Sequence, residues 1–143
     1  MRPLLLLFLC FLTIHAYVPS NPAYSGKQNT AQIGEYLIKL LIEGIESRNT
    51  ESISGLLAEK FYFVDCKGTF HREQFIILLT SLPPKSKLTY KLKFSEKKRD
   101  FITIESTIVL MSADGSKKNF ETVFYFDIEK SRFENGGITN CKE

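Results

Sequence analysis

The chain has 143 residues, a formal net charge of +3 and 43% hydrophobic residues, values that fit one ordinary globular domain. Its one dense basic run, Lys97 to Arg99, lies between two predicted strands and is typical of a solvated turn. A nucleic-acid-binding protein would carry a basic stripe instead, so we expect no nucleic-acid partner.

The first 16 residues have the pattern of a secretory signal peptide. Arg2 provides the positive charge, an apolar run covers residues 4–12, and Ala16 is a small residue at the expected cleavage site. The apolar run is too short for a helix that spans a bilayer. We therefore expect a secreted, extracellular protein with no membrane association after cleavage of residues 1–16.

The next segment, residues 17–28, contains two prolines, a glycine and several small polar residues. This composition predicts a flexible N-terminus. Helical periodicity begins only after Asn29, so we expect the folded domain to cover residues 29–143.

Two cysteines, Cys66 and Cys141, remain after removal of the signal peptide, which contains Cys10. Because exported proteins meet an oxidising environment, we expect these two to form a disulfide. Closing so long a loop is worth roughly 4–5 kcal/mol in the chain-entropy description. A reactive thiol or a metal-binding pair is the alternative.

Two helices are predicted first. One covers about residues 31–47, with Asn29 or Thr30 as its N-cap and apolar residues at the spacing of one buried stripe. A shorter helix follows, capped by Asn49 or Thr50.

The stretch from Phe61 to Thr80 then predicts an aromatic strand over residues 61–65, a turn at Lys67-Gly68 and a third helix. Phe70 and Phe75 have the spacing of a hydrophobic staple around its N-terminus. The apolar stripe of this helix is expected to consist of Phe75, Leu78, Leu79 and Leu82.

The rest of the chain predicts an antiparallel meander of about four strands, with a hairpin turn at Asp114-Gly115. The last strand contains Gly136-Gly137, which suggests a bulge. Alternation predicts that three strands share one inward face, made of Leu88, Tyr90, Leu92 and Phe94; Ile102, Ile104, Ser106, Ile108 and Leu110; and Phe120, Thr122, Phe124, Phe126 and Ile128. Helices grouped before hairpin-linked strands indicate an α+β fold.

This order resembles the nuclear transport factor 2-like superfamily, a cystatin-like α+β fold, and is most similar to secreted nematode proteins with such a domain. The resemblance covers about residues 30–141 and rests on packing and turn motifs. They are Glu46-Ser47-Arg48-Asn49, Leu56-Leu57, Phe61-Tyr62-Phe63, Cys66-Lys67-Gly68-Thr69-Phe70, the residues Glu73, Phe75, Leu78 and Leu79, and Glu134-Asn135-Gly136-Gly137 before Cys141.

The resemblance implies a cone-shaped α+β barrel, with three N-terminal helices packed on a strongly curved, mostly antiparallel sheet. The mouth of such a cone often holds a pocket, and family members include isomerases, dehydratases, ligand binders and interaction modules. Their enzymes place an Asp or His inside the cone as an acid or base. The fold alone therefore selects no function.

Asp65 and His71 are the catalytic candidates, as an acid–base pair of a small lyase or isomerase at the cone mouth. The simpler interpretation gives both residues structural roles. His71 falls at an N-cap position, and the Asp65 carboxylate lies beside a turn, where it can accept hydrogen bonds from backbone N–H groups. One remaining His and two paired cysteines are too few for a metal site, so we expect neither a metal nor another cofactor.

Aromatic residues at predicted inward positions form a candidate ligand-binding set, with core packing as the alternative. This set is Tyr36, Phe63, Tyr90, Phe94, Phe124 and Phe126. A second apolar set, Phe101, Val109, Val123 and Tyr125, is predicted on the outer sheet face, where the resemblance implies homodimerisation. We therefore expect a secreted, non-enzymatic binding domain for a hydrophobic small molecule or an extracellular protein.

Overall fold

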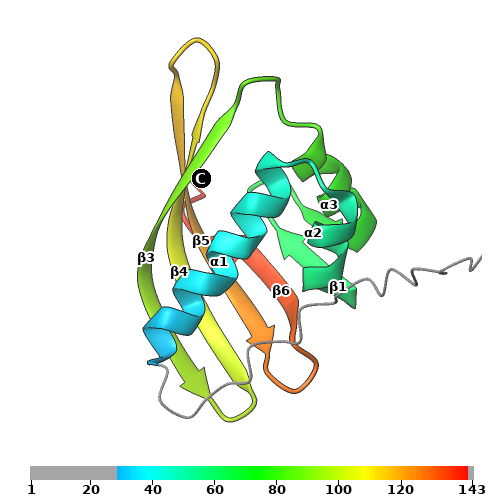
Figure 1. Cartoon of the computed structure of the whole chain (residues 1–143), viewed down its shortest axis with the longest axis vertical. Helices are drawn as coiled ribbons and strands as arrows, with labels where there is room; N and C mark the ends of the chain where they lie inside the picture. The colour runs from blue at the N-terminus through cyan, green and yellow to red at the C-terminus, as the bar shows by residue number, and fades with distance from the viewer. Residues whose placement is uncertain (1–28, 142–143) are drawn as a thin grey trace, which may run out of the picture.

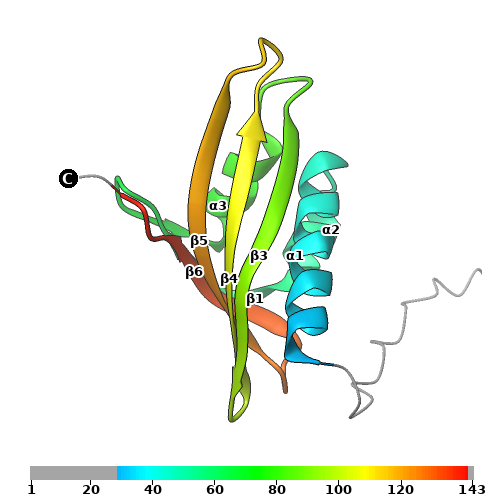
Figure 2. The ribbon, with the colours of Figure 1, turned by 90° about the vertical axis from the view of Figure 1, so that its left-hand side faces the viewer.

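The computed structural model describes residues 29–141, so the predicted signal peptide and flexible N-terminus lie outside the described residues. Within this range, three helices lie on one side of a curved six-stranded sheet (Figures 1 and 2). The elements are α1 (Thr30–Glu46), α2 (Thr50–Leu56), β1 (Leu57–Val64), β2 (Thr69–His71), α3 (Arg72–Thr80), β3 (Lys87–Lys98), β4 (Phe101–Met111), β5 (Lys117–Asp127) and β6 (Arg132–Ile138). The predicted α+β class is confirmed.

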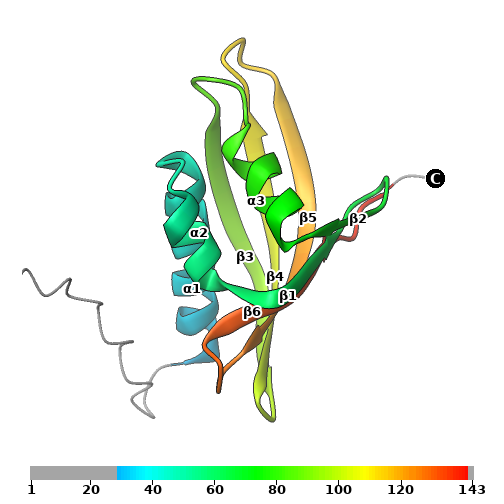
Figure 3. The ribbon, with the colours of Figure 1, turned by 90° about the vertical axis from the view of Figure 1, so that its right-hand side faces the viewer.

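The strands follow the order β2-β1-β6-β5-β4-β3. Every neighbouring pair is antiparallel except β1 and β6, which run parallel. The sheet is strongly curved but not closed into a barrel, because β2 and β3 remain as separate edges and the helices lie between them (Figure 3). The six-stranded sheet includes one short strand, β2, that the sequence pattern did not predict.

Local sequence signals place the helices well. Asn29 caps α1, since its Oδ1 accepts the Ala31 N–H at 3.1 Å. Asn49 caps α2 in the same way, through the Ser52 N–H at 3.0 Å. Strand β1 then starts at Leu57, before the predicted residue 61.

The third helix starts as predicted, with His71 at the N-cap position and the Gln74 side chain accepting the His71 backbone N–H at 2.9 Å. Its predicted apolar stripe is partly wrong. Ile76 is buried, whereas Leu78 is 42% exposed. The helix lies on β1 and β2, so its core-facing side is set by those strands, and Leu78 turns away from them.

A bulge in β3 changes which side chains face the helices. Register between β3 and β4 shifts between Leu92 and Phe94, so Lys93 is the extra residue. Beyond it, Ser95 rather than Phe94 faces α1, and its Oγ donates to the Thr30 carbonyl at 3.0 Å. A Cβ added at Gly34 would lie 2.6 Å from the Ser95 Oγ. Small residues therefore allow α1 to approach β3 closely.

The core fills the lower part of the inner, helix-covered sheet face. Phe61, Phe63, Phe124 and Phe133 are at most 6% exposed and pack with Phe75 from α3 and with apolar residues of α1. A Cβ at Gly136 would lie 2.5 Å from the Phe124 ring. This glycine therefore makes room for an aromatic ring, and the irregularity of β6 lies at Glu134 rather than at the predicted Gly136-Gly137.

Candidate functional site

Asp65 and His71 lie at opposite ends of the short β1–β2 hairpin. The Asp65 Oδ1 accepts the backbone N–H groups of Lys67 at 2.7 Å and of Gly68 at 2.9 Å. His71 is exposed and pairs with Tyr62 of β1. Asp65 follows Tyr62 by three residues, a distance of roughly 10 Å along the extended chain. The structure therefore places the two residues at opposite ends of the hairpin. Asp65 lies in the turn and His71 at the N-cap of α3, as the structural interpretation predicts.

Three of the six candidate ligand-binding residues fill the core. Phe63, Phe124 and Phe126 are 6%, 1% and 2% exposed. The Phe63 ring stacks on Phe75 with centroids 4.5 Å apart and lies 5.8 Å from the Phe124 ring. These side chains pack against one another, as in the alternative interpretation.

The other three candidates lie in three different parts of the structure. Tyr36 lies on the exposed side of α1, with 45% of its surface accessible. Tyr90 is half-buried on the inner face, where burial raises its pKa and the Glu35 carboxylate adds to this effect. The inward placement of Phe94 is wrong, because the bulge at Lys93 rotates it to the outer face opposite Glu105, where it is 46% exposed.

The inner face of the sheet opens beyond the core. Cross-strand register defines successive rows of side chains across β3, β4 and β5. Going upward in Figure 1, the last three rows are Leu92–Ser106–Thr122, Tyr90–Ile108–Phe120 and Leu88–Leu110–Lys118. We call the apolar residues of the upper two rows, Leu88, Tyr90, Ile108, Leu110 and Phe120, the mouth.

Exposure rises abruptly at the mouth. On β4, Ile102, Ile104 and Ser106 are fully buried, whereas Ile108 and Leu110 are only half-buried. Helix α1 packs mainly on β3, and α3 packs on β1 and β2. The upper ends of β4 and β5 therefore extend beyond the helices (Figures 1 and 3).

A buried hydroxyl pair forms the floor of the mouth. Thr122 Oγ1 donates to the Ser106 carbonyl at 3.0 Å, and the Ser106 and Thr122 hydroxyls lie 2.9 Å apart. Because the Thr122 proton is used on the carbonyl, Ser106 Oγ must donate to Thr122 Oγ1. Both protons are satisfied internally, so the floor offers no free donor.

The strand positions of the two upper rows carry no carboxylate and no imidazole, but the Glu35 carboxylate of α1 lies close enough to Tyr90 to raise its pKa further than burial alone does. The titratable side chains on the two upper rows are Tyr90 and Lys118. A general base would need a group with a pKa near working pH at this place. The carboxylate beside the mouth comes from α1, not from the strands.

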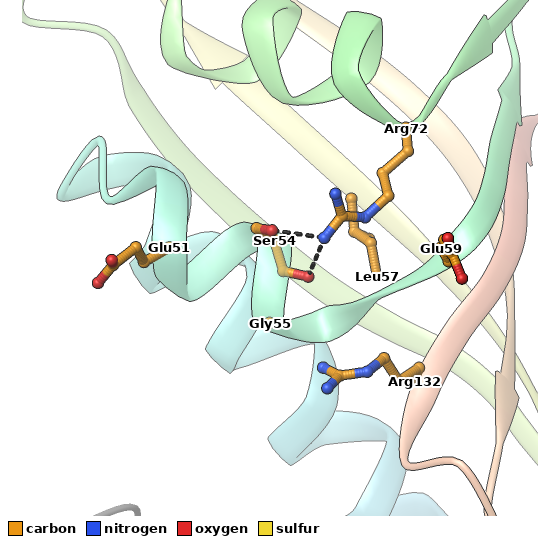
Figure 4. Close-up of a pocket in the computed structure, with 7 residues that line it drawn as sticks. All are labelled: Glu51, Ser54, Gly55, Leu57, Glu59, Arg72 and Arg132. Carbon is orange, nitrogen blue, oxygen red and sulfur yellow. Dashed lines mark hydrogen bonds between the residues drawn. The ribbon is translucent and has the colours of Figure 1, made fainter. Parts of the chain in front are cut away.

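A hollow of about 400 Å³ lies beside α2 (Figure 4). Its lining residues are Glu51, Ser54, Gly55, Leu57, Glu59, Arg72 and Arg132. The Arg72 guanidinium donates to the Ser54 carbonyl at 2.9 Å and to the Ser54 hydroxyl, which ties the start of α3 to α2. The lining contains two arginines and two glutamates, so it has no net charge that would select an ionic ligand.

The disulfide predicted between Cys66 and Cys141 is present, with a Cα–Cα distance of 5.2 Å. Among residues 29–141, no cluster of three or more His, Cys, Asp or Glu side chains could hold a metal ion. No helix in the same range combines the length and apolarity that a bilayer crossing needs.

Comparison with known proteins agrees with this architecture. The NTF2-like domain family matches residues 31–143.

The chain belongs to the NTF2-like domain family.

Solved structures share its fold at low sequence identity. An NTF2-like protein from Cytophaga hutchinsonii superposes with a TM-score of 0.63 at 17% identity, covering 78% of this chain and 98% of that chain. A cystatin-like domain of unknown function from Nostoc punctiforme gives 0.65 at 11% identity, covering 81% and 80%. An LEH-like epoxide hydrolase of M. tuberculosis gives 0.57 at 9% identity, covering 75% and 81%. No curated protein matches the sequence.

Sequence reasoning missed two features of this NTF2-like domain. The bulge at Lys93 leaves no signal in an otherwise regular alternation, so Phe94 was assigned to the wrong face. The inward position of Lys118 did have a signal, since it continues the alternation of Phe120 and Thr122 toward the hairpin.

Proposed function

We propose that this NTF2-like protein is a secreted, non-enzymatic binding protein whose mouth takes a hydrophobic small molecule. The observation that carries the proposal is the change along one sheet face from buried to half-buried apolar side chains at Ile108, Leu110 and Phe120. Binding of an apolar ligand to a concave, half-buried apolar surface is favourable because it removes that surface from water.

Binding can be tested by titrating the purified protein with a fluorescent fatty acid or steroid. Saturable binding is expected, and Leu110→Asn should weaken it about tenfold through loss of apolar contact. Val109→Asn is the matched control, because Val109 is the neighbouring half-buried residue on the outer face. Absence of saturable binding, or equal loss in both variants, would count against the proposal.

Secretion is part of the same proposal. The N-terminal pattern of residues 1–16 supports it, as does the Cys66–Cys141 disulfide, which an oxidising compartment would maintain. We also propose kinship with secreted nematode proteins that contain this domain. Mass spectrometry of the exported protein should find an N-terminus at Tyr17 and two fewer hydrogens than the reduced chain. An intact N-terminus on a cytosolic protein would contradict this.

The alternative, a lyase or isomerase that uses Asp65 and His71, has less support. The epoxide hydrolase among the structural neighbours shows that the fold can carry an enzyme. In this chain, however, the Asp65 carboxylate binds two backbone N–H groups of its own turn, and neither candidate lies on the rows of the mouth.

A second copy of the chain is the candidate protein partner, through the outer sheet face. Phe94, Phe101 and Tyr125 there are 46%, 41% and 39% exposed, and Val109 and Val123 beside them are half-buried. The bulge adds Phe94 to the apolar set that the sequence predicted. Exposed aromatic groups on one face favour an interface.

Sedimentation velocity at micromolar concentration tests this interface. A mass twice that of the chain is expected, and Phe94→Glu should shift it to the monomer. Tyr36→Glu is the control, since Tyr36 is equally exposed, at 45%, but lies on α1. A monomeric wild-type protein would remove the proposal.

A further inference from the structure

The rim of the mouth carries one inward lysine. On β5, Phe120, Thr122 and Phe124 share the inner face, and Lys118 continues the same alternation without a register shift. Lys118 lies directly opposite Leu110, one row beyond the Ile108–Phe120 pair. An ammonium group therefore borders an apolar surface on the concave side of the sheet.

Lys118 differs from several other strand and turn lysines in its partners. Lys93 pairs with Glu121 at 2.8 Å, Lys98 with Glu96 at 2.9 Å, and Lys130 with Glu134 at 2.7 Å. Within residues 29–141, Lys118 has no carboxylate within ion-pair distance. A ligand anion could therefore take this place without displacing an existing pair of the described chain.

Two acidic groups at this end accept backbone hydrogen bonds, and Glu35 and Glu43 of α1 lie near Tyr90. The Glu46 Oε1 accepts the Leu88 backbone N–H at 3.2 Å, and the Asp114 Oδ1 accepts the Ser116 N–H at 2.9 Å within the hairpin. Lys87 and Lys117 flank Met111 in the next row, whose side chains lie on the opposite face, and add positive charge to this end of the sheet. The α1 carboxylates therefore lie on the β3 side of the mouth, and the positive charge that suits a negatively charged group lies on the β5 side, at Lys118.

We propose that the mouth binds a free medium-chain carboxylate, with its head group on Lys118 and its alkyl chain along the apolar rows. This inference rests on the proposed binding function and names the class of ligand. The carboxylate accepts hydrogen bonds from the Lys118 ammonium, while Leu110, Ile108 and Phe120 contact the chain. The apolar end points to the Ser106–Thr122 floor, whose hydroxyl protons are already used.

The depth of the rows sets the length of the ligand. Lys118 and Thr122 are four residues apart on one strand, a distance of about 13 Å. With carbon–carbon bonds of about 1.5 Å, an extended chain of about ten carbon atoms covers it. Decanoate is therefore a suitable probe, and decanol is its neutral counterpart.

The test is isothermal titration calorimetry of the purified, disulfide-bonded protein with monomeric decanoate and with decanol. The wild-type protein should bind decanoate roughly tenfold more tightly, as one partly exposed charge-assisted contact allows. Lys118→Gln should abolish this preference by weakening decanoate binding about tenfold. Lys117→Gln, which changes the adjacent lysine on the other face, should keep it.

The possible results separate the two proposals. Equal affinity of the wild-type protein for decanoate and decanol would overturn the head-group assignment and leave the apolar mouth standing. No saturable binding of either compound would overturn both. Binding to vesicles of phosphatidylcholine with phosphatidylglycerol, without binding of monomeric decanoate, would replace the free ligand with a membrane surface and also overturn the inference.

Discussion

The closed end of the inner sheet face and the mouth are built from the same residue types on the same strands. Phe124 and Phe120 are both inward on β5, yet Phe124 is 1% exposed and Phe120 is half-buried. The difference comes from what covers them. Phe124 meets Phe63 and Phe133, whereas Phe120 lies on the part of β5 that extends beyond the helices. An inward position on a strand therefore does not by itself make a core residue.

The largest expected effect on stability comes from a comparison of two alanine variants, one at each end of the inner sheet face. Phe124→Ala should lower the free energy of unfolding by roughly 3–5 kcal/mol, since it leaves a cavity in a closed core. Phe120→Ala should lower it by about 1 kcal/mol, because less surface is buried there. Urea unfolding followed by circular dichroism measures both. Equal losses would mean that the mouth is as closed as the core.

A smaller loss of stability is expected at Gly136, where the absence of a side chain leaves room for the Phe124 ring. Gly136→Ala places a Cβ 2.5 Å from the Phe124 ring, so we expect a cost of about 1–3 kcal/mol from overpacking. Gly55→Ala is the control. No atom lies within 4 Å of a Cβ there, and alanine in a helix should be neutral or stabilising by about 0.5–1 kcal/mol. Thermal unfolding of both variants gives the comparison.

The boundary between the two regions is the Ser106–Thr122 pair. Ser106→Ala removes the hydroxyl that donates to Thr122 Oγ1 and should cost about 1 kcal/mol. A double-mutant cycle with Thr122→Val should show coupling between the two sites, because they form one hydrogen-bonded unit. Strictly additive losses would show that the pair does not act as such a unit.

The smallest effect is the pH dependence at the closed end. The backbone N–H of Lys130 donates to the Asp127 carboxylate at 3.0 Å and lowers its pKa. Because its pKa is lower in the folded protein, ionised Asp127 stabilises the fold at pH values above its unfolded pKa of about 3.9. This stabilisation is lost as the pH falls through the pKa of the folded state. The stability difference between the wild type and Asp127→Asn should therefore shrink below about pH 4. Leu110→Asn in the mouth should show no such trend.

How much of this could be predicted from sequence depended on the range of each interaction. Caps and turns act within a few residues, so Asn29, His71 and Asp65 were assigned correctly. The antiparallel meander followed from alternation and hairpin signals. The disulfide followed from the expected oxidising compartment and from the two cysteines that remain after removal of the predicted signal peptide.

Features set by distant parts of the chain could not be predicted. The parallel pairing of β1 with β6 joins strands far apart in sequence, and no local pattern encodes it. The exposed side of α3 depends on which strands it packs against, so Leu78 was assigned wrongly. For the candidate site, alternation identified the inward residues of β4 and β5, but only the placement of the helices separated the mouth from the core.

The parallel pairing of β1 with β6 also affects the order in which the protein can be assembled during synthesis. Val64 pairs with Gly137, so β1 has only the three-residue β2 as a partner until the end of β6 has been made. An isolated two-stranded hairpin is marginally stable in water. At typical elongation rates, Phe61 and Phe63 would wait about 4–15 seconds for their final neighbours. During that interval the unfinished chain exposes an aromatic strand, so a translocation channel or a chaperone that shields it should increase the yield of folded protein.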